Sequence, residues 1–261
     1  MSAFEADPFF QYARTAVATS EGNVDLPFFV YEASIFSSGY WIDLERAQAL
    51  VVNTGLEAVR FENGKALIGV NFYDYRNTSV GSYREVATAV AVVPKGLTPP
   101  RFPFLSLFGN MDKVAMGFYI FDLPVTTAAA DVAGREIWGL PKFVTQIDFA
   151  RNGERFEIRV TDPDTKDTIL KFSGVGGVGA PGPLFDAVLL SSKHGKILRT
   201  VVTTRGGAKF RFAGSIRLEV SDIQHPMAQR LIALGLKDAQ PSFFSQSDKL
   251  QMRLSAGAPL P

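Results

Sequence analysis

Hydrophobic and polar residues alternate along this chain in short runs that are separated by Gly, Pro, Asn and Asp. Runs of this length and composition predict β-strands, and their close succession predicts an antiparallel sheet that closes on itself. The predicted strands are residues 28–36, 66–75, 84–93, 113–123, 143–150, 155–162, 168–174, 197–205 and 208–220. The pattern therefore indicates a mainly β protein of the α+β class.

The alternation is most regular in "FVTQIDF", residues 143–149. Successive side chains of a strand point to opposite faces, so every second residue shares a face. One face then carries Phe143, Thr145, Ile147 and Phe149. Lys142 stands directly before this run, and we expect its side chain on the face opposite Phe143.

Two segments have the pattern of helices that pack on a β core. Residues 43–51 begin at Asp43, which is a suitable N-cap, and residues 225–236 have Pro226 at the first helical position. One side of the second helix carries Met227, Leu231 and Leu234. No repeat or linker divides the sequence, which predicts a single domain over residues 1–261 with a peripheral N-terminal segment of roughly 20 residues.

Composition and charge narrow the classes of function. The 261 residues include 27 Lys and Arg against 26 Asp and Glu, so the net charge is +1 and no broad positive field exists to attract nucleic acid. The sequence has no cysteine, which excludes disulfides, thiolate nucleophiles and zinc sites built on cysteine. Nucleic acid is therefore not an expected partner.

Targeting and membrane signals are also not evident. Residues 1–16 lack a basic segment followed by an apolar one, so a secretory signal is not expected. The longest apolar run, residues 86–93, is about half as long as a membrane span and is typical of a buried strand. We therefore expect a cytoplasmic protein with no membrane partner.

Two other features have simple explanations. "GVGGVG", residues 174–179, matches the spacing of a dinucleotide-binding glycine motif, but Pro181 and Pro183 follow where that motif requires a helix. A flexible turn is expected there instead. His194 and His225 are far apart and lack any hydrolase or metal-binding motif, so we expect a loop residue and a helix-start residue, and no metal site.

Lys142 lies in the segment "GREIWGLPKFV" and has apolar neighbours. They are Trp138, Leu140, Pro141 and Phe143. A lysine amine is protonated in water at neutral pH, but apolar surroundings favour its neutral form. A neutral amine attacks a ketone and forms a Schiff base, whose iminium withdraws electrons from the adjacent carbon. The alternative is a lysine at a strand end that extends its amine into solvent.

Three segments resemble the acetoacetate decarboxylase superfamily. "GREIWGLPKF", residues 134–143, is similar to its active-site segment, where a Gly-Arg-Glu triplet precedes Pro-Lys and the lysine forms the Schiff base. "VGSYREVATAV", residues 80–90, is similar to its Gly-x-Tyr-x-Glu stretch, and residues 212–234 resemble its C-terminal strand and Pro-started helix. The resemblance covers roughly residues 25 to 255.

The resemblance implies a cone-like closed β-barrel with a few packing helices, assembled as a homo-oligomer. It also implies a carbon–carbon lyase that needs no cofactor and acts on a small keto acid or ketone. Lys142 takes the Schiff-base position, and Glu85 takes the position of the glutamate after the tyrosine. The activity implied first is decarboxylation of a β-keto acid through a lysine iminium and an enamine.

Further site residues follow from the same comparison. Glu85 is the candidate for proton transfer, with Tyr83 or Asn71 as hydrogen-bonding groups. The structural alternative for Glu85 is an ion pair with Arg135 or Arg84. The other predicted substrate-binding residues are Arg135, Glu136, Met116, Phe118, Trp138 and Leu140.

The sequence also departs from the superfamily pattern. The second lysine after the reactive one is replaced by Phe143, so only desolvation remains to favour a neutral amine. The glutamate of the preceding strand is replaced by Asn71, or by Val70 without a gap, and the N-terminal arginine that meets the substrate carboxylate is missing from residues 25–36. Arg76 or Arg84 could serve a carboxylate instead.

Two further functions stay open, the first as a variation within the superfamily and the second because of these departures. One is an aldolase or dehydratase that uses the same lysine on an α-keto acid. The other is a catalytically silent barrel that binds a small apolar ligand, with Lys142 held in a salt bridge.

Overall fold

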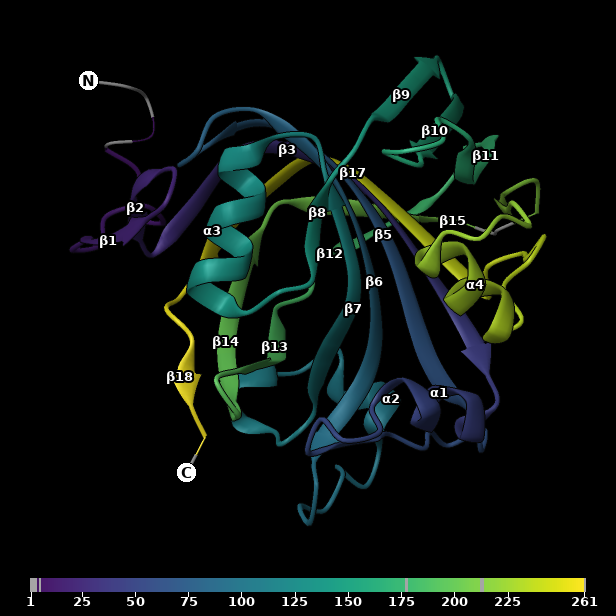
Figure 1. Ribbon diagram of the computed structural model, residues 1–261, viewed down its shortest axis with the longest axis horizontal. Coiled ribbons are helices and arrows are strands. Elements are labelled where there is room, and N and C mark those ends of the chain that lie inside the picture. Colours follow the sequence, from purple (N-terminus) through teal and green to yellow (C-terminus); the bar gives the residue numbers. More distant parts are fainter. Residues whose placement is uncertain (1–3, 5, 177, 212–213, 261) are drawn as a thin grey trace.

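The computed structural model describes residues 4, 6–176, 178–211 and 214–260. Within this part of the chain, seven strands close into a barrel (Figure 1). In pairing order they are β17 (Phe243–Leu254), β3 (Phe28–Ile42), β5 (Ala66–Thr78), β6 (Tyr83–Pro94), β7 (Gly117–Val125), β13 (Ala187–Lys193) and β14 (Lys196–Arg205). All neighbours are antiparallel except β7 and β13. β14 closes the ring by pairing with β17. The predicted mainly β fold with a closed barrel is confirmed.

The remaining strands extend this barrel or form separate sheets. A second sheet consists of β16 (Arg217–Val220), β11 (Thr168–Val175), β10 (Arg155–Thr161) and β9 (Ile147–Asn152). A hairpin is formed by β1 (Thr15–Thr19) and β2 (Gly22–Leu26). The barrel sheet also includes β4 (Leu56–Ala58), β8 (Lys142–Val144), β12 (Ala180–Pro183), β15 (Gly207–Arg211) and β18 (Ala258–Pro259).

The helices are short and connect or cover strands. They are α1 (Leu44–Leu50), α2 (Pro103–Ser106), α3 (Ala128–Trp138) and α4 (Pro226–Ala233), with a single 3₁₀ turn at Met111–Lys113. Helix α3 follows the barrel strand β7 and leads into β8, so it connects two strands that pair side by side.

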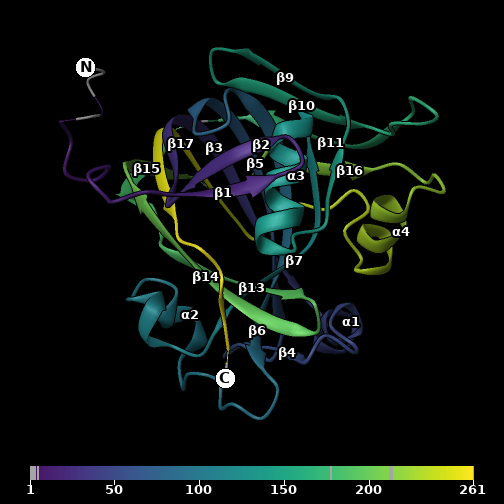
Figure 2. The same ribbon diagram turned by 60° about the vertical axis from the view of Figure 1, so that its left-hand side comes forward.

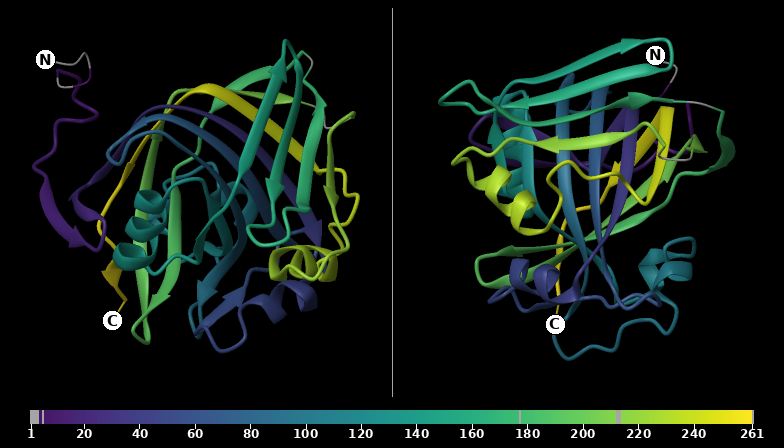
Figure 3. Two further views of the ribbon diagram at one scale, coloured as in Figure 1. Left: turned by 45° about the horizontal axis from the view of Figure 1, so that its top comes forward. Right: turned by 90° about the vertical axis from the view of Figure 1, so that its right-hand side faces the viewer.

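Aromatic side chains join the second sheet to the barrel, and Figure 3 shows the two sheets side by side. Phe172 of β11 stacks on Phe72 of β5 with ring centroids 4.4 Å apart and an interplanar angle of 9°. Phe156 of β10 packs against Phe244 of β17 at 5.8 Å. Phe72 and Phe172 are completely buried, so apolar burial is the main attachment between the sheets.

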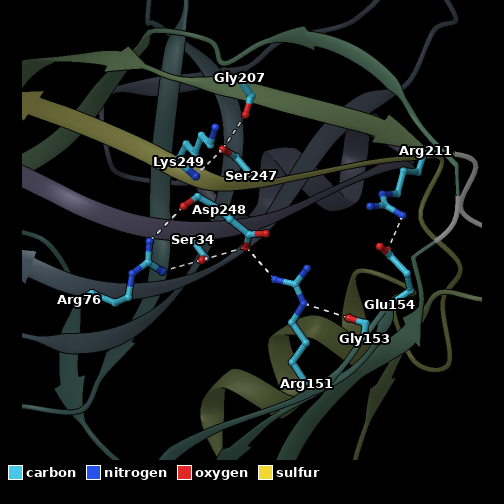
Figure 4. Close-up of polar contacts among 10 residues, drawn as sticks. All are labelled: Ser34, Arg76, Arg151, Gly153, Glu154, Gly207, Arg211, Ser247, Asp248 and Lys249. Atoms are coloured by element: carbon cyan, nitrogen blue, oxygen red, sulfur yellow. Dashed lines mark hydrogen bonds and ion pairs between the residues drawn. The ribbon is translucent and has the colours of Figure 1, made fainter.

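A polar cluster supports the same junction (Figure 4). Asp248 lies where the pairing of β17 with β3 is irregular. Its Oδ1 accepts hydrogen bonds from Ser34 of β3 at 3.1 Å and from Arg151 of β9 at 2.8 Å. Arg76 of β5 donates to the carbonyl oxygen of Asp248 at 3.1 Å and to Ser34 at 2.7 Å. Asp248 therefore links the barrel to the second sheet.

Two of the predicted strands are divided in the structure. The predicted run 143–150 consists of β8, which pairs with the barrel strand β7, and β9, which belongs to the second sheet. The run 208–220 is divided into β15 and β16, and residues 212–213 lie outside the described residues. Composition identifies strand-forming segments, but it does not reveal where a chain leaves one sheet for another.

The two predicted helices are confirmed as α1 and α4. Asp43 precedes α1, but its side chain makes no capping hydrogen bond. His225 is the N-cap of α4, and its ring nitrogen accepts a hydrogen bond from the N–H of Met227 at 3.2 Å. Helix α3 is missing from the sequence-based prediction, although Thr127 caps its start and Gly139 ends it.

The loop predictions agree with the described residues. His194 lies in the turn after β13, with φ of 50°. Within the glycine run 174–179, β11 ends at Val175 and β12 begins at Ala180, with no helix among the described residues between them. Residue 177 lies outside the described residues, so the predicted turn is only partly visible.

The β1–β2 hairpin lies beside α3 (Figure 2). The backbone N–H of Ser20 donates to Glu136 Oε2 at 3.0 Å, and the Ser20 hydroxyl donates to Oε1 at 2.5 Å. These two hydrogen bonds attach the hairpin to the helix. Among the described residues, no helix combines the length and the apolar character that crossing a bilayer requires.

Candidate active site

Lys142 is positioned by the end of α3. Gly139 adopts a left-handed φ of 65° and ends the helix, and the N–H of Leu140 donates to the carbonyl of Gly134 at 3.1 Å. Pro141 follows and favours an extended chain at the preceding residue. β8 then pairs in parallel with β7, with Lys142 beside Leu123. The turn therefore delivers Lys142 directly onto a barrel strand.

The side chain of Lys142 runs along α3 at Gly134. A Cβ placed on Gly134 would lie 2.3 Å from Cε and 2.4 Å from Cδ of Lys142. No side chain larger than hydrogen fits at that position with the lysine in place. Glycine in a helix interior costs about 1 kcal/mol relative to alanine. Its presence is explained by the path of the lysine side chain.

Lys142 and Glu85 form a buried ion pair. Lys142 Nζ is 2.6 Å from Glu85 Oε2, and the two side chains are 7% and 9% exposed. The other carboxylate oxygen accepts a hydrogen bond from the hydroxyl of Tyr75 at 3.3 Å. Lys142 Nζ also lies 5.4 Å from the ring centroid of Tyr83, within the range of a cation–π contact. Phe143 contacts His225, so it points away from this group as predicted.

Three tyrosines surround Glu85 because of the strand register. Tyr73 pairs with Glu85 across β5 and β6, and Tyr75 pairs with Tyr83. The rings of Tyr73 and Tyr75 stack at 5.1 Å. Burial raises the pKa of Tyr73, Tyr75 and Tyr83 well above the usual tyrosine value, and the negative charge of Glu85 raises each pKa further. All three hydroxyls are therefore neutral hydrogen-bond donors.

A cavity of about 100 Å³ lies beside the ion pair. Its polar lining consists of Lys142, Glu85 and the three tyrosines, among the described residues. Its apolar lining includes Phe28, Ile120, Leu123, Trp138, Leu140 and Met252. The cavity is thus a small apolar chamber with one amine, one carboxylate and three phenols at one side.

Half of the sequence-predicted site residues line this cavity. They are Lys142, Glu85, Tyr83, Trp138 and Leu140. The indole N–H of Trp138 donates to the carbonyl of Ser255 at 3.0 Å, which leaves the ring as the apolar surface towards the cavity. The placement is consistent with the predicted roles, which stay predictions.

The other five predicted residues do not line the cavity. Asn71 lies two residues before Tyr73 in β5. Its side chain accepts a hydrogen bond from Ser37 at 2.6 Å. Met116 is completely buried in the barrel core, and Phe118 packs against that core. Met116 precedes β7, whereas the cavity receives later residues of this strand.

Arg135 and Glu136 lie on the outer side of α3. Arg135 pairs with Asp131 at 2.9 Å, one helical turn earlier, and its side chain is about half exposed. Glu136 binds Ser20 of the hairpin. Successive helical residues are 100° apart, so neither can share the face on which Gly134 meets the lysine. Their placement does not support direct substrate contact.

The predicted alternative partners of Glu85 and of a substrate carboxylate are also engaged elsewhere. Arg84 pairs with Asp74 at 3.3 Å and donates to the carbonyl of Ile147. The alternative in which Glu85 pairs with Arg84 or Arg135 is therefore wrong. Arg76 is held in the Asp248 cluster.

Sequence reasoning missed Tyr73, Tyr75 and the role of Gly134. The alternation in "NFYDY" places both tyrosines on one face with Asn71, and this signal could have found them. Which of the three residues reaches Glu85 depends on strand register, and the sequence pattern alone does not fix that register between two buried strands.

The sequence matches the family model of acetoacetate decarboxylase (ADC) over residues 14–250, a range that contains the ion pair and the Gly134 helix. The chain belongs to the acetoacetate decarboxylase family. Members of this family are lyases. A sequence search among curated proteins gives no match.

Solved structures share the fold of this family member. Acetoacetate decarboxylase from Legionella pneumophila has a TM-score of 0.66 and 16% identity, covering 98% of this chain and 93% of that one. An acetoacetate decarboxylase-like enzyme from Sphingomonas wittichii RW1 has a TM-score of 0.63 and 12% identity, covering 91% and 94%. The enduracididine biosynthesis enzyme MppR, solved with pyruvate, has a TM-score of 0.60 and 13% identity, covering 90% of each chain. At such identities the likeness establishes the fold.

Proposed function

We propose that this protein is a lyase in which Lys142 forms a Schiff base with a small keto acid and decarboxylates a β-keto acid. The observation that carries the proposal is the Lys142 amine, enclosed in an apolar cavity and 2.6 Å from Glu85. An amine and a proton acceptor in contact are the two groups that iminium formation requires. Membership of the acetoacetate decarboxylase family supports the same chemistry.

The ion pair supplies the first steps. Lys142 transfers a proton to Glu85, and the neutral amine attacks the carbonyl carbon of the substrate. Glu85 returns this proton to the carbonyl oxygen, which gives a carbinolamine. Glu85 then takes a second proton from the nitrogen and delivers it to the hydroxyl, which leaves as water as the C=N bond forms. The products are a cationic iminium on Lys142 and the Glu85 carboxylate beside it, so the net charge of the site is unchanged.

Loss of CO2 follows from the position of the iminium. The electrons of the bond between the α-carbon and the carboxylate flow to the iminium, giving CO2 and a neutral enamine. An apolar cavity disfavours the bound carboxylate and accepts neutral CO2. A solvent proton that passes through Glu85 then reaches the enamine carbon, and water hydrolyses the resulting iminium to release the ketone.

An aldolase or dehydratase acting on an α-keto acid is the second candidate, because it would use the same amine and MppR, solved with pyruvate, has the same fold. A silent binding barrel is the third, because a buried ion pair can also be purely structural. The apolar lining favours the decarboxylase, since an α-keto acid must keep its carboxylate in the cavity throughout the reaction.

Borohydride trapping with a panel of β- and α-keto acids tests the proposal. Peptide mapping should find the reduced adduct on Lys142, and the products should include CO2 from β-keto acids. The matched control is Lys142→Arg, which keeps a cation beside Glu85 but forms no Schiff base. A condensation product without CO2 would indicate the aldolase, and ligand binding with no adduct from any carbonyl compound would falsify the lyase.

A further inference from the structure

The hydroxyls of two cavity tyrosines are available to a ligand. Tyr75 donates to Glu85, but no hydrogen bond joins the hydroxyl of Tyr73 or Tyr83 to another of the described residues. Both side chains line the cavity, next to Lys142 and Glu85. Neither hydroxyl is among the fully enclosed polar atoms that lack a partner, which places both at the open space of the cavity, where a bound ligand can accept their hydrogen bonds.

The cavity offers little else to a charged ligand. Among its described lining residues, Lys142 is the only cation, and the amine is consumed when the Schiff base forms. Arg76 and Arg84 are bound to other residues away from the cavity. A carboxylate that enters beside the iminium therefore finds neutral phenols, and no guanidinium, as its hydrogen-bond donors.

We propose that Tyr73 and Tyr83 anchor the substrate carboxylate, and that they restrict the enzyme to keto acids with a single carboxylate. The inference rests on the proposed Schiff-base function and deepens it. One carboxylate can accept one hydrogen bond from each hydroxyl while the iminium supplies the opposite charge. A second carboxylate would have to lie against aliphatic and aromatic side chains, where an unpaired charge is strongly disfavoured.

This anchor differs from an arginine clamp in its effect on CO2 loss. A guanidinium would stabilise the carboxylate charge strongly, and that stabilisation would be lost when neutral CO2 forms. Neutral hydroxyls orient the carboxylate with weaker stabilisation of its charge. The tyrosines are kept neutral by their burial and by the nearby Glu85 carboxylate. The site thus holds the leaving group and does not oppose its departure.

Three probes of similar size separate charge from shape: butanone, acetoacetate and oxaloacetate carry none, one and two carboxylates. The rate of borohydride-trapped adduct on Lys142 is measured against concentration for each probe. Acetoacetate should saturate at a concentration at least 10-fold lower than oxaloacetate. Equal saturation by both anions would overturn the inference while leaving the Schiff-base function intact, whereas no adduct from any probe would overturn both.

Tyr73→Phe and Tyr83→Phe test the anchors themselves. Each loses one hydrogen bond to a charged group, so each should raise the half-saturating concentration of acetoacetate by about 10-fold. Butanone trapping should change by less than 2-fold, and it also reports that each variant is folded with a reactive amine. Tyr40→Phe, a buried tyrosine outside the cavity, is the matched control. An equal loss with butanone and acetoacetate would assign the hydroxyls to the carbonyl and overturn the carboxylate anchor.

Discussion

The side chain of Lys142 crosses α3 at Gly134, where a Cβ would come within 2.3 Å of the lysine Cε. The glycine of the Gly-Arg-Glu triplet therefore leaves the space through which the Lys142 side chain passes. The path of the Lys142 side chain thus depends on the absence of a side chain at Gly134 in α3.

Gly134→Ala is expected to displace the amine while the protein stays folded. The flexible lysine stem can move away from the added methyl group, and alanine is the better helix former by about 1 kcal/mol. We expect an unchanged or slightly raised melting temperature and a loss of at least 10-fold in the rate of adduct formation on Lys142. A variant that traps substrate at the wild-type rate would contradict this role of Gly134.

Gly139→Ala provides the contrasting result. Its φ of 65° suits glycine, and a Cβ would lie 2.7 Å from the carbonyl oxygen of Ser192. We expect a loss of about 1 to 2 kcal/mol in unfolding free energy, measured by urea denaturation. Together the two variants separate the stability of the turn from the reactivity of the lysine.

Glu85→Gln is expected to slow proton transfer strongly. General acid–base groups contribute about 10²- to 10⁴-fold to a rate, so kcat should fall within that range. Because a buried ion pair is broken, the unfolding free energy should also fall by about 3 kcal/mol. Lys142→Met should have a similar cost, and the double variant should cost clearly less than the sum. Strict additivity would argue against direct coupling of the two side chains.

Acid should release the N-terminal segment. Hydrogen bonds from Arg205 and from the N–H of Phe9 lower the pKa of Asp7 from 3.8 to about 2. Because the folded pKa is depressed, the contact stabilises the folded form above about pH 4, and this stabilisation is lost as the pH falls towards 2. A carboxyl NMR titration should report the low pKa, and Arg205→Gln should return it close to 3.8. An Asp7 pKa near 3.8 in the wild-type protein would show that the contact does not form.

The attachment of the second sheet should depend on aromatic packing more than on charge. Phe172→Ala removes a completely buried ring from the stack on Phe72, which costs about 3 to 5 kcal/mol. Asp248→Ala removes an ion pair whose side chains are 41% and 50% exposed, and surface pairs contribute about 1 kcal/mol or less. Chemical denaturation measures the loss of unfolding free energy in both variants. A larger loss for Asp248→Ala than for Phe172→Ala would contradict the prediction.

The sequence predicted the barrel because its strand-length apolar patterns reflect burial: β5 alternates between more and less buried residues, whereas β6 is a nearly continuous buried run. It also singled out Lys142 and Glu85, since their segments resemble known ones and the strand pattern set Lys142 opposite Phe143; the two side chains are in contact, and their roles stay predictions. These predictions depend on local sequence patterns, which can be recognised within a single segment of the chain.

The residues that sequence reasoning misplaced depend on geometry beyond the segment. Arg135 and Glu136 adjoin Gly134 in sequence, but the unpredicted helix α3 turns them to the other side. Asn71 and Tyr73 share a face of β5, and only the register with β6 selects Tyr73. The β8–β9 run looked like one strand because its side-chain pattern continues across the change of sheet.

The barrel and the second sheet are joined by Thr145 and Gln146, which follow the barrel strand that carries Lys142. Just after it, the N–H of Thr145 donates to the barrel carbonyl of Val125 at 2.8 Å, and the N–H of Thr161 in the second sheet donates to Gln146 at 3.0 Å. We expect a shift of one sheet against the other to reach the strand of Lys142 through this link. A substitution in the remote aromatic stack at Phe172 is thus expected to change the rate of adduct formation on Lys142 in the molecules that remain folded, which would make the second sheet a support of the proposed active site.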